Sequence, residues 1–204
     1  MSNPDFIHRF VPSQSGSARV LLLLHGTGGD ESDLLPLASE LDPTVAVLSP
    51  RGKVMENGMP RFFRRFAEGV FDEEDIILRA NELADFVSAA AEKYSFGANN
   101  VTAVGYSNGA NIAAAMMLLR PEILQSAVLF RAMVTLSNPP PAQLTGKRVF
   151  LSAGRHDPII PLPNVQQLAA VLKNAGAEVT LEIREASHGL LQEDLVAAKR
   201  WLSS

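Results

Sequence analysis

The sequence contains no cysteine among its 204 residues. A disulfide framework, a thiolate metal site and a cysteine nucleophile are therefore excluded. No apolar run approaches the roughly 20 residues that a membrane-spanning helix needs. Residues 1–5 also lack the basic start and apolar stretch of a secretory signal peptide. We therefore expect a cytoplasmic protein without a membrane span.

Basic residues are in slight deficit, with 18 Lys and Arg against 22 Asp and Glu and a net charge of −4. Nucleic-acid-binding domains usually present a basic face, so we expect no nucleic-acid partner. The only basic cluster, residues 61–66 (RFFRRF), is too short and too rich in phenylalanine to be typical of a nucleic-acid contact.

Apolar runs typical of strands alternate with helical patterns along the chain, which suits one domain over residues 1–204. Ser32 or Asp33 is the expected N-cap of the first helix, and residues 51–71 form a long polar and aromatic segment. Repeated strand–helix units predict an α/β fold with a mostly parallel central sheet and helices on both faces. Little sequence separates residues 130 and 148, so we expect no cap domain. The expected strands are residues 6–11, 19–24, 45–49, 101–104, 127–130, 148–153 and 179–183, and the expected helices are residues 34–38, 72–91, 110–117, 165–172 and 190–202.

The sequence Gly-x-Ser-x-Gly stands at residues 105–109, between a predicted strand and a predicted helix. A serine on such a turn is a nucleophile elbow, in which the serine is strained and exposed at the end of the sheet. A side chain at Gly105 or Gly109 would collide with this turn. The motif alone is equally compatible with a helix start capped by serine, so its context has to decide.

An elbow of this type is followed along the chain by an acid and then a histidine. Beyond Ser107 the chain has two histidines, His156 and His188, and two aspartates, Asp157 and Asp194. No aspartate separates Ser107 from His156, and Asp194 follows both histidines. The order therefore predicts a catalytic triad of Ser107, Asp157 and His188. Four glutamates remain formal alternatives for the acid, although each is expected to be a solvated charge: Glu122, Glu178, Glu182 and Glu185.

Asp157 and His188 each follow a predicted strand, which ends at residue 153 and near residue 183 respectively. Ligands of open parallel sheets bind outside the carboxyl ends of the strands, so the three residues are expected to converge there. Taken singly, Asp157 could form a turn before Pro158 and His188 could cap a loop beside Gly189.

Residues 25–29 (HGTGG) directly follow a buried strand and could place a backbone amide near the substrate. We expect the amides of Thr27 and Asn108 to form the oxyanion hole. A plain turn is the alternative, whereas neither a Walker motif nor a dinucleotide-binding glycine motif is present. His25 is expected to brace the loop.

The chain resembles the phospholipase/carboxylesterase family of α/β-hydrolases, which includes the acyl-protein thioesterases. Within it the chain is most similar to small bacterial esterases of the hydroquinone-resistance type. Acyl-protein thioesterases usually have glutamine where this chain has Asn108. The resemblance implies a carboxylesterase acting on short acyl esters, with a homodimer left open. The segments that carry it are residues 25–29 (HGTGG), 34–38 (LLPLA), 56–65 (ENGMPRFFRR), 71–75 (FDEED), 105–113 (GYSNGANIA) and 187–189 (SHG).

The expected substrate is a small acyl ester, and the triad chemistry requires neither a metal nor an organic cofactor. Phe62, Phe63, Met133 and Leu190 are candidates for the substrate-binding wall, with ordinary core packing as the alternative. A thioesterase or lysophospholipase would use the same triad, and peptidase activity stays open. A hydrolase fold retained as a non-catalytic binding protein is the alternative from another class. Dienelactone hydrolase chemistry typically needs a cysteine, which this chain lacks.

Overall fold

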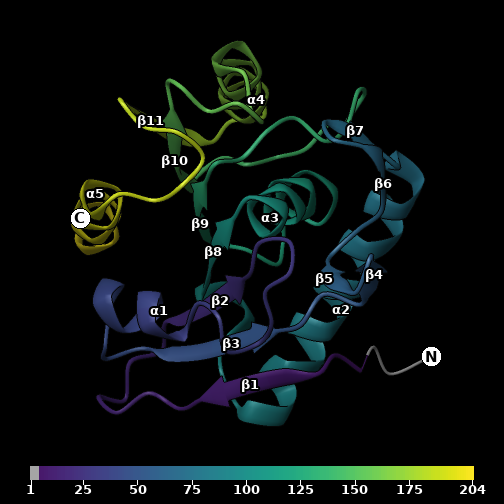
Figure 1. Cartoon of the computed structure of the whole chain (residues 1–204). Coiled ribbons are helices and arrows are strands. Elements are labelled where there is room, and N and C mark those ends of the chain that lie inside the picture. Colours follow the sequence, from purple (N-terminus) through teal and green to yellow (C-terminus); the bar gives the residue numbers. More distant parts are fainter. Residues whose placement is uncertain (1–4) are drawn as a thin grey trace.

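Seven strands form one central sheet in the computed structural model of the protein, which describes residues 5–204. The prediction that the chain has no secretory signal peptide concerns mainly residues 1–4, which lie outside this range. Strand β1 is antiparallel to β3, whereas all other neighbouring pairs in this sheet are parallel. The strands lie in the order β1 (His8–Val11), β3 (Ala46–Pro50), β2 (Val20–Leu24), β8 (Val101–Tyr106), β9 (Ser126–Phe130), β10 (Arg148–Gly154) and β11 (Glu178–Arg184) (Figure 1).

Helices cover both faces of this sheet, as Figure 1 shows. Successive residues of a strand point to opposite faces. Accordingly, Val20, Leu22 and Leu24 pack with α2 (Glu73–Tyr94), α3 (Asn108–Leu119) and α4 (Leu162–Asn174). Leu21 and Leu23 pack with α1 (Leu35–Leu41) and α5 (Gln192–Ser203) on the other face. A 3₁₀ turn, η1 (Ala98–Asn100), precedes β8. The predicted α/β architecture is confirmed.

The polar segment at residues 51–71 forms two β-hairpins that the sequence analysis did not predict. They are β4 (Val54–Glu56) with β5 (Met59–Arg61) and β6 (Arg65–Ala67) with β7 (Val70–Phe71). Asn57 and Gly58 connect the first pair with φ angles of 51° and 80°. An Asn-Gly pair favours this two-residue turn because both residues tolerate positive φ. Strands of two or three residues are too short to give a periodic pattern.

The start of the first helix differs from the prediction. Leu34 is the N-cap of α1 and no side chain caps the helix. Neither Ser32 nor Asp33, the two predicted caps, therefore caps the helix, and the Ser32 hydroxyl instead accepts a hydrogen bond from Arg9 Nε at 2.8 Å. By contrast, α2 has the expected acidic start, where Asp72 accepts a hydrogen bond from the Asp75 amide at 3.1 Å. None of the helices in the described part of the chain has both the length and the apolar character needed to cross a membrane.

Candidate active site

Ser107 lies on the turn between β8 and α3 with φ of 52° and ψ of −113°. Such an angle is strained for a residue other than glycine, and the surrounding packing has to enforce it. The Ser107 amide donates to the carbonyl of Phe130 at 2.9 Å. A Cβ on Gly109 would lie 1.9 Å from the carbonyl oxygen of Leu24, and one on Gly105 would lie 2.6 Å from the Ala110 backbone. The glycines therefore permit the close packing that holds the serine in place.

His188 lies between Ser107 and Asp157. Its Nε2 is 3.0 Å from Ser107 Oγ, and its Nδ1 is 2.7 Å from Asp157 Oδ2. The other oxygen of Asp157 accepts from the amides of Ile159 and Ile160 at 2.8 and 3.0 Å. One carboxylate thus shapes the turn after β10 and orients the imidazole. The structure brings together the three side chains that the chain order singled out.

The alternative residues lie in other settings. His156 Nε2 is 2.9 Å from Glu185, and this carboxylate also pairs with Arg155 on the exposed surface. Glu122 and Glu182 form ion pairs with Arg120 and Arg184 respectively. His188 therefore has Asp157 as its carboxylate partner, and these glutamates have other partners.

Thr27 and Asn108 line the same pocket as Ser107 and His188. Asn108 is the first residue of α3, so its amide has no acceptor within the helix. The Thr27 amide likewise has no hydrogen-bond acceptor among residues 5–204. Two free amides thus border the space beside the serine. Their part in an oxyanion hole remains a prediction.

The segment carrying Thr27 is tied to the first hairpin. The Gly28 amide donates to the Pro60 carbonyl at 3.0 Å, and Arg61 Nη1 donates to Thr27 Oγ1 at 2.8 Å. The side chain of Asn108 accepts from the Phe62 amide at 2.7 Å. The hairpin therefore positions both sides of the candidate oxyanion hole.

The His25 side chain holds the loop that carries Thr27 through two hydrogen bonds. Its Nδ1 donates to the Gly26 carbonyl at 2.7 Å, and its Nε2 accepts from the Gly52 amide at 2.9 Å. These partners fix the proton on Nδ1, because the Gly26 carbonyl can only accept and the Gly52 amide can only donate. Burial lowers the pKa of His25, which keeps the imidazole neutral. The geometry is that of a structural brace.

Ser107 lines a pocket of about 290 Å³ whose lining is apolar in part and polar or charged in part. Met133 is the one predicted substrate-side residue among the lining residues. Arg61 and Arg65 belong to the basic cluster at residues 61–66, but their place in the pocket was not predicted from the sequence. The apolar lining residues are Phe71, Met133, Ile159 and Ile160, and the polar ones beside Ser107 and His188 are Thr27, Arg61, Arg65, Glu68, Tyr106, Asn108 and Asn111.

The other three predicted substrate-side residues do not line this pocket. Phe62 and Phe63 are buried in the core, where Phe62 packs against the His25 ring at a centroid distance of 4.7 Å and Phe63 packs against Phe71 at 5.3 Å. Leu190 is partly buried and packs against the cluster between the sheet and α1 and α5. These aromatic and apolar contacts use the side chains in packing, which was the alternative interpretation of all three residues.

A buried ion pair fixes the loop that carries His188. Arg131 follows β9 with a φ of 56°, is fully buried and donates to Asp194 Oδ2 at 2.7 Å. It also donates to the Gly189 carbonyl at 2.8 Å and to Ser152 Oγ at 2.9 Å. Burial works to raise the pKa of Asp194, but hydrogen bonds from Arg131, the Leu191 amide and Ser152 outweigh it and lower the pKa. This network joins the His188 loop to β9, β10 and α5.

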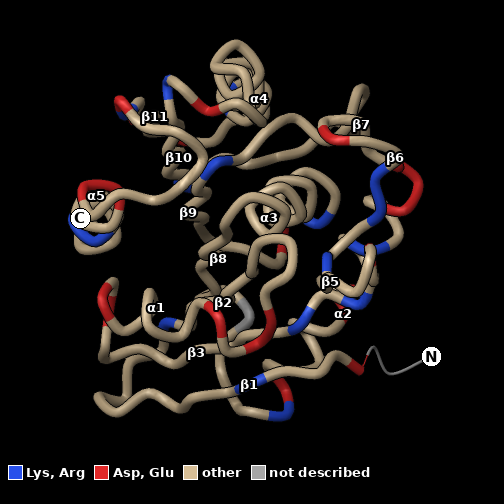
Figure 2. Tube along the Cα trace, in the orientation of Figure 1, with Lys and Arg blue, Asp and Glu red and all other residues tan. Residues whose placement is uncertain are grey.

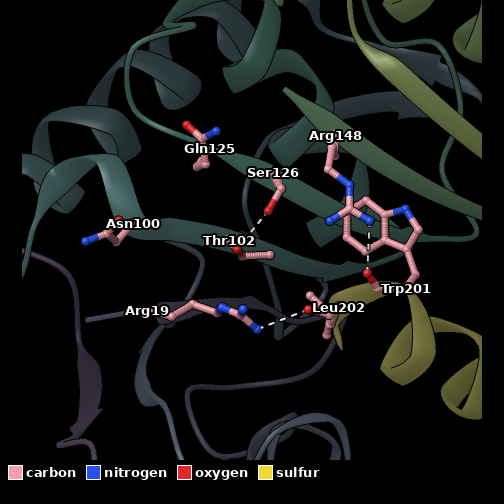
Figure 3. A pocket seen from close by; sticks show the side chains of 8 residues that line it. All are labelled: Arg19, Asn100, Thr102, Gln125, Ser126, Arg148, Trp201 and Leu202. Atoms are coloured by element: carbon pink, nitrogen blue, oxygen red, sulfur yellow. Dashed lines mark hydrogen bonds between the residues drawn. The ribbon is translucent and has the colours of Figure 1, made fainter. Parts of the chain in front are cut away.

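A second pocket of about 250 Å³ lies near the amino ends of β8, β9 and β10, whereas Ser107 follows the carboxyl end of β8; Figure 3 shows the residues that line this second pocket. Arg148 Nη2 donates to the Trp201 carbonyl at 3.1 Å, and Arg19 Nη1 donates to the Leu202 carbonyl at 3.2 Å. Cations at a helix C-terminus satisfy its free carbonyls and oppose its dipole. These arginines therefore anchor the end of α5.

A parallel sheet with a strained serine on the turn after a central strand, backed by a histidine and an aspartate, defines the α/β-hydrolase class. The profile of the phospholipase/carboxylesterase family matches residues 7–204, and the chain belongs to that family. The predicted membership is confirmed, as is the prediction of a carboxylic ester hydrolase at the level of the family.

Individual relatives agree with this assignment. MhqD of Bacillus subtilis (strain 168) is 44% identical over 193 residues, which are 95% of this chain and 96% of that protein. The Bacillus cereus carboxylesterase structure has a TM-score of 0.96 and 48% identity, covering 99% of this chain and 95% of that chain. YahD, solved with malic acid, has a TM-score of 0.91 and 35% identity, with 98% of both chains covered.

Proposed function

We propose that the protein is a serine carboxylesterase that hydrolyses short- to medium-chain acyl esters through Ser107, His188 and Asp157. The observation that carries the proposal is the continuous contact from Asp157 Oδ2 through both nitrogens of His188 to Ser107 Oγ, at 2.7 and 3.0 Å. Both distances are hydrogen-bond distances, and the order of partners is the one that activates a serine hydroxyl.

In the proposed reaction, His188 Nε2 takes the proton of Ser107 as Oγ attacks the acyl carbonyl. Asp157 stabilises the imidazolium and fixes the ring orientation, while the amides of Thr27 and Asn108 donate to the oxyanion. His188 then protonates the departing alcohol, which leaves an acyl-serine. The same histidine deprotonates a water that attacks this ester, and the acid product leaves with Ser107 restored.

The pocket supports a small or medium acyl group. Its volume is about 290 Å³, and only four apolar side chains line it, which limits the apolar surface available to a long acyl chain. YahD was solved with malic acid, a four-carbon acid, which agrees with a small ligand. A thioesterase or lysophospholipase would use the same proposed triad, so the leaving group has to be tested directly.

The proposed unit is a single domain of residues 1–204 that acts in the cytoplasm. The absence of cysteine agrees with a reducing compartment. The proposed chemistry uses only side chains and amides of this chain together with water.

The test is hydrolysis of a p-nitrophenyl ester series from acetate to palmitate by the wild type and by Ser107→Ala. We expect activity on the shorter esters, and a loss of about 10⁴-fold or more in the variant because the nucleophile is removed. Comparing oxygen and thiol esters of one acyl group then measures the leaving-group preference. Palmitate cleaved faster than butyrate would contradict the chain-length proposal. A folded wild type inactive on every ester and thioester would favour a non-catalytic binding protein.

A further inference from the structure

One carboxylate, that of Glu56, pairs with two guanidinium groups that line the pocket. Glu56 Oε2 is 3.0 Å from Arg61 Nη1, and Glu56 Oε1 is 2.9 Å from Arg65 Nε. The next arginine, Arg64, is engaged elsewhere, with Asp72 and Asp75. Figure 2 shows blue Lys and Arg positions along the stretch of chain that runs from β5 to β6. The group of Glu56, Arg61 and Arg65 therefore keeps one uncompensated positive charge.

That charge lies at the pocket that contains Ser107. Arg61 and Arg65 line the pocket together with Ser107, whereas Glu56 does not. Neither Nη1 nor Nη2 of Arg65 has a hydrogen-bond partner among residues 5–204, and the same holds for Arg61 Nη2. Guanidinium groups with free terminal nitrogens bind carboxylates through parallel hydrogen bonds. The pocket thus offers unused donors of the kind that a carboxylate accepts.

Burial makes this charge costly without an anion. The Arg61 side chain is only 3% exposed. Burial lowers the pKa of Arg61, the neighbouring Arg65 lowers it further, and Glu56 offsets these effects only in part. A buried charge is stabilised when an opposite charge and further hydrogen bonds reach it. A second anion in the pocket would supply both.

Glu68 is the one acidic side chain that lines the pocket. It lies in the turn between β6 and β7, is exposed, and forms no ion pair within the described residues. Solvent screens an exposed charge far more than a buried one, so Glu68 weakens the positive field only in part. The apolar lining residues, which include Met133 and Ile160, would contact apolar parts of the substrate.

We propose that the pocket selects esters that carry a carboxylate, with Arg65 and Arg61 binding that carboxylate while Ser107 attacks the ester carbonyl. This inference rests on the proposed esterase function and names its substrate class. The shared Glu56 and the free terminal nitrogens are the observations that carry it. Arg61 also holds Thr27, so Arg65 is the residue whose removal tests charge recognition with the least disturbance of the oxyanion loop.

The experiment compares monomethyl glutarate with methyl pentanoate, in which a methyl group replaces the carboxylate. Methanol release gives kcat/KM for the wild type, Arg65→Gln, Glu68→Gln and Arg64→Gln. In the wild type we expect the charged ester to be preferred at low ionic strength. Arg65→Gln should reduce the charged-to-neutral ratio about tenfold, the loss expected for one hydrogen-bonded charge. Glu68→Gln should raise the ratio, and Arg64→Gln, which lies outside the pocket, should leave it unchanged.

The outcomes separate this inference from the esterase proposal. A wild type that prefers methyl pentanoate, or an Arg65→Gln effect no larger than that of Arg64→Gln, overturns the charge inference. Cleavage of p-nitrophenyl butyrate without cleavage of monomethyl glutarate also overturns it, while the esterase proposal stands. Failure on every ester, p-nitrophenyl butyrate included, overturns the esterase proposal itself.

Discussion

At the scale of single residues, His25 links two loops only while it is neutral. Its Nε2 accepts from the Gly52 amide, and a proton on Nε2 would remove that hydrogen bond. Since burial lowers the folded-state pKa of His25 below the ordinary value of 6.5, the unfolded chain binds the proton more readily. Stability from this group is therefore complete above about pH 6.5 and is lost as the pH falls from there toward the lower folded-state pKa.

We predict that His25→Gln reduces the change in unfolding free energy between about pH 8 and about pH 5 relative to the wild type. Urea unfolding at several pH values measures this difference. His156→Gln is the matched control, because His156 lies exposed beside Glu185. An unchanged pH dependence in His25→Gln would show that another group dominates this range.

Residue identity predicted part of the candidate site because few residues could fill each position. Beyond Ser107 only two histidines and two aspartates had to be considered, and the order of acid before histidine selected Asp157 and His188. Arg61 and Arg65 could not be assigned in this way, because their side-chain directions depend on hairpins with no periodic signal. Phe62 and Phe63 show the same limit, since a pattern of residue types does not say which side of a short strand faces a pocket.

At the scale of elements, the Arg131–Asp194 pair joins the sheet to α5 and to the loop carrying His188. Both side chains are fully buried. Removing one partner of a buried pair leaves an uncompensated charge, which costs about 3–5 kcal/mol. The Gly189 carbonyl would also lose a well-positioned donor, because Arg131 would reorient.

We predict that Asp194→Asn lowers the free energy of unfolding by about 3–5 kcal/mol and also lowers kcat for ester hydrolysis. Urea unfolding and steady-state kinetics measure the two effects. Glu193→Gln is the matched control, since Glu193 is the exposed neighbour in the same first turn of α5. Because the pKa of Asp194 in the folded protein is below the ordinary value of 3.8, its stabilising effect is complete above about pH 3.8. The effect is lost as the pH falls from there toward the lower folded-state pKa. Equal stability of Asp194→Asn and Glu193→Gln would refute the role assigned to the pair.

The regular elements were predictable where they were long. Strand β2 is buried on both faces and reads as a continuous apolar run, and α2 repeats its apolar residues at helical spacing over 22 residues. The N-cap of α1 was predicted wrongly, because the helix begins after Leu34, beyond both polar candidates, Ser32 and Asp33. The two hairpins depend on tertiary contacts, such as the hydrogen bond from the Gly28 amide to the Pro60 carbonyl.

At the scale of the whole molecule, the residues at the carboxyl ends of the strands and those at the amino ends have different roles. The proposed triad lies at the carboxyl ends of the strands, whereas Arg19 and Arg148 anchor the end of α5 at the amino ends (Figure 3). Trp201 packs between Phe150 and the Arg148 guanidinium, at centroid distances of 5.9 and 4.5 Å. These contacts stabilise the fold at the amino ends of the strands, and none of these three residues lines the pocket that contains Ser107.

We predict that Trp201→Ala lowers the free energy of unfolding by about 3–5 kcal/mol, the usual cost of removing a buried aromatic side chain. Because Trp201 does not line the pocket that contains Ser107, kcat and KM measured on the folded fraction at low temperature should match the wild type. Val196→Ala, at an exposed position of the same helix, is the control and should change stability little. A changed KM in Trp201→Ala would mean that packing at the amino ends of the strands affects the Ser107 pocket at their carboxyl ends.

The two pocket arginines and the proposed triad come from different parts of the chain. Arg61 and Arg65 lie on the two hairpins within residues 54–71, whereas Ser107, Asp157 and His188 all follow residue 100. The first hairpin also holds the Thr27 loop and the Asn108 side chain, through Pro60, Arg61 and Phe62. Exchange of residues 54–71 between relatives would therefore alter the proposed charge recognition and the support of the oxyanion hole together, so new selectivity can be grafted through this segment only if those three contacts are kept.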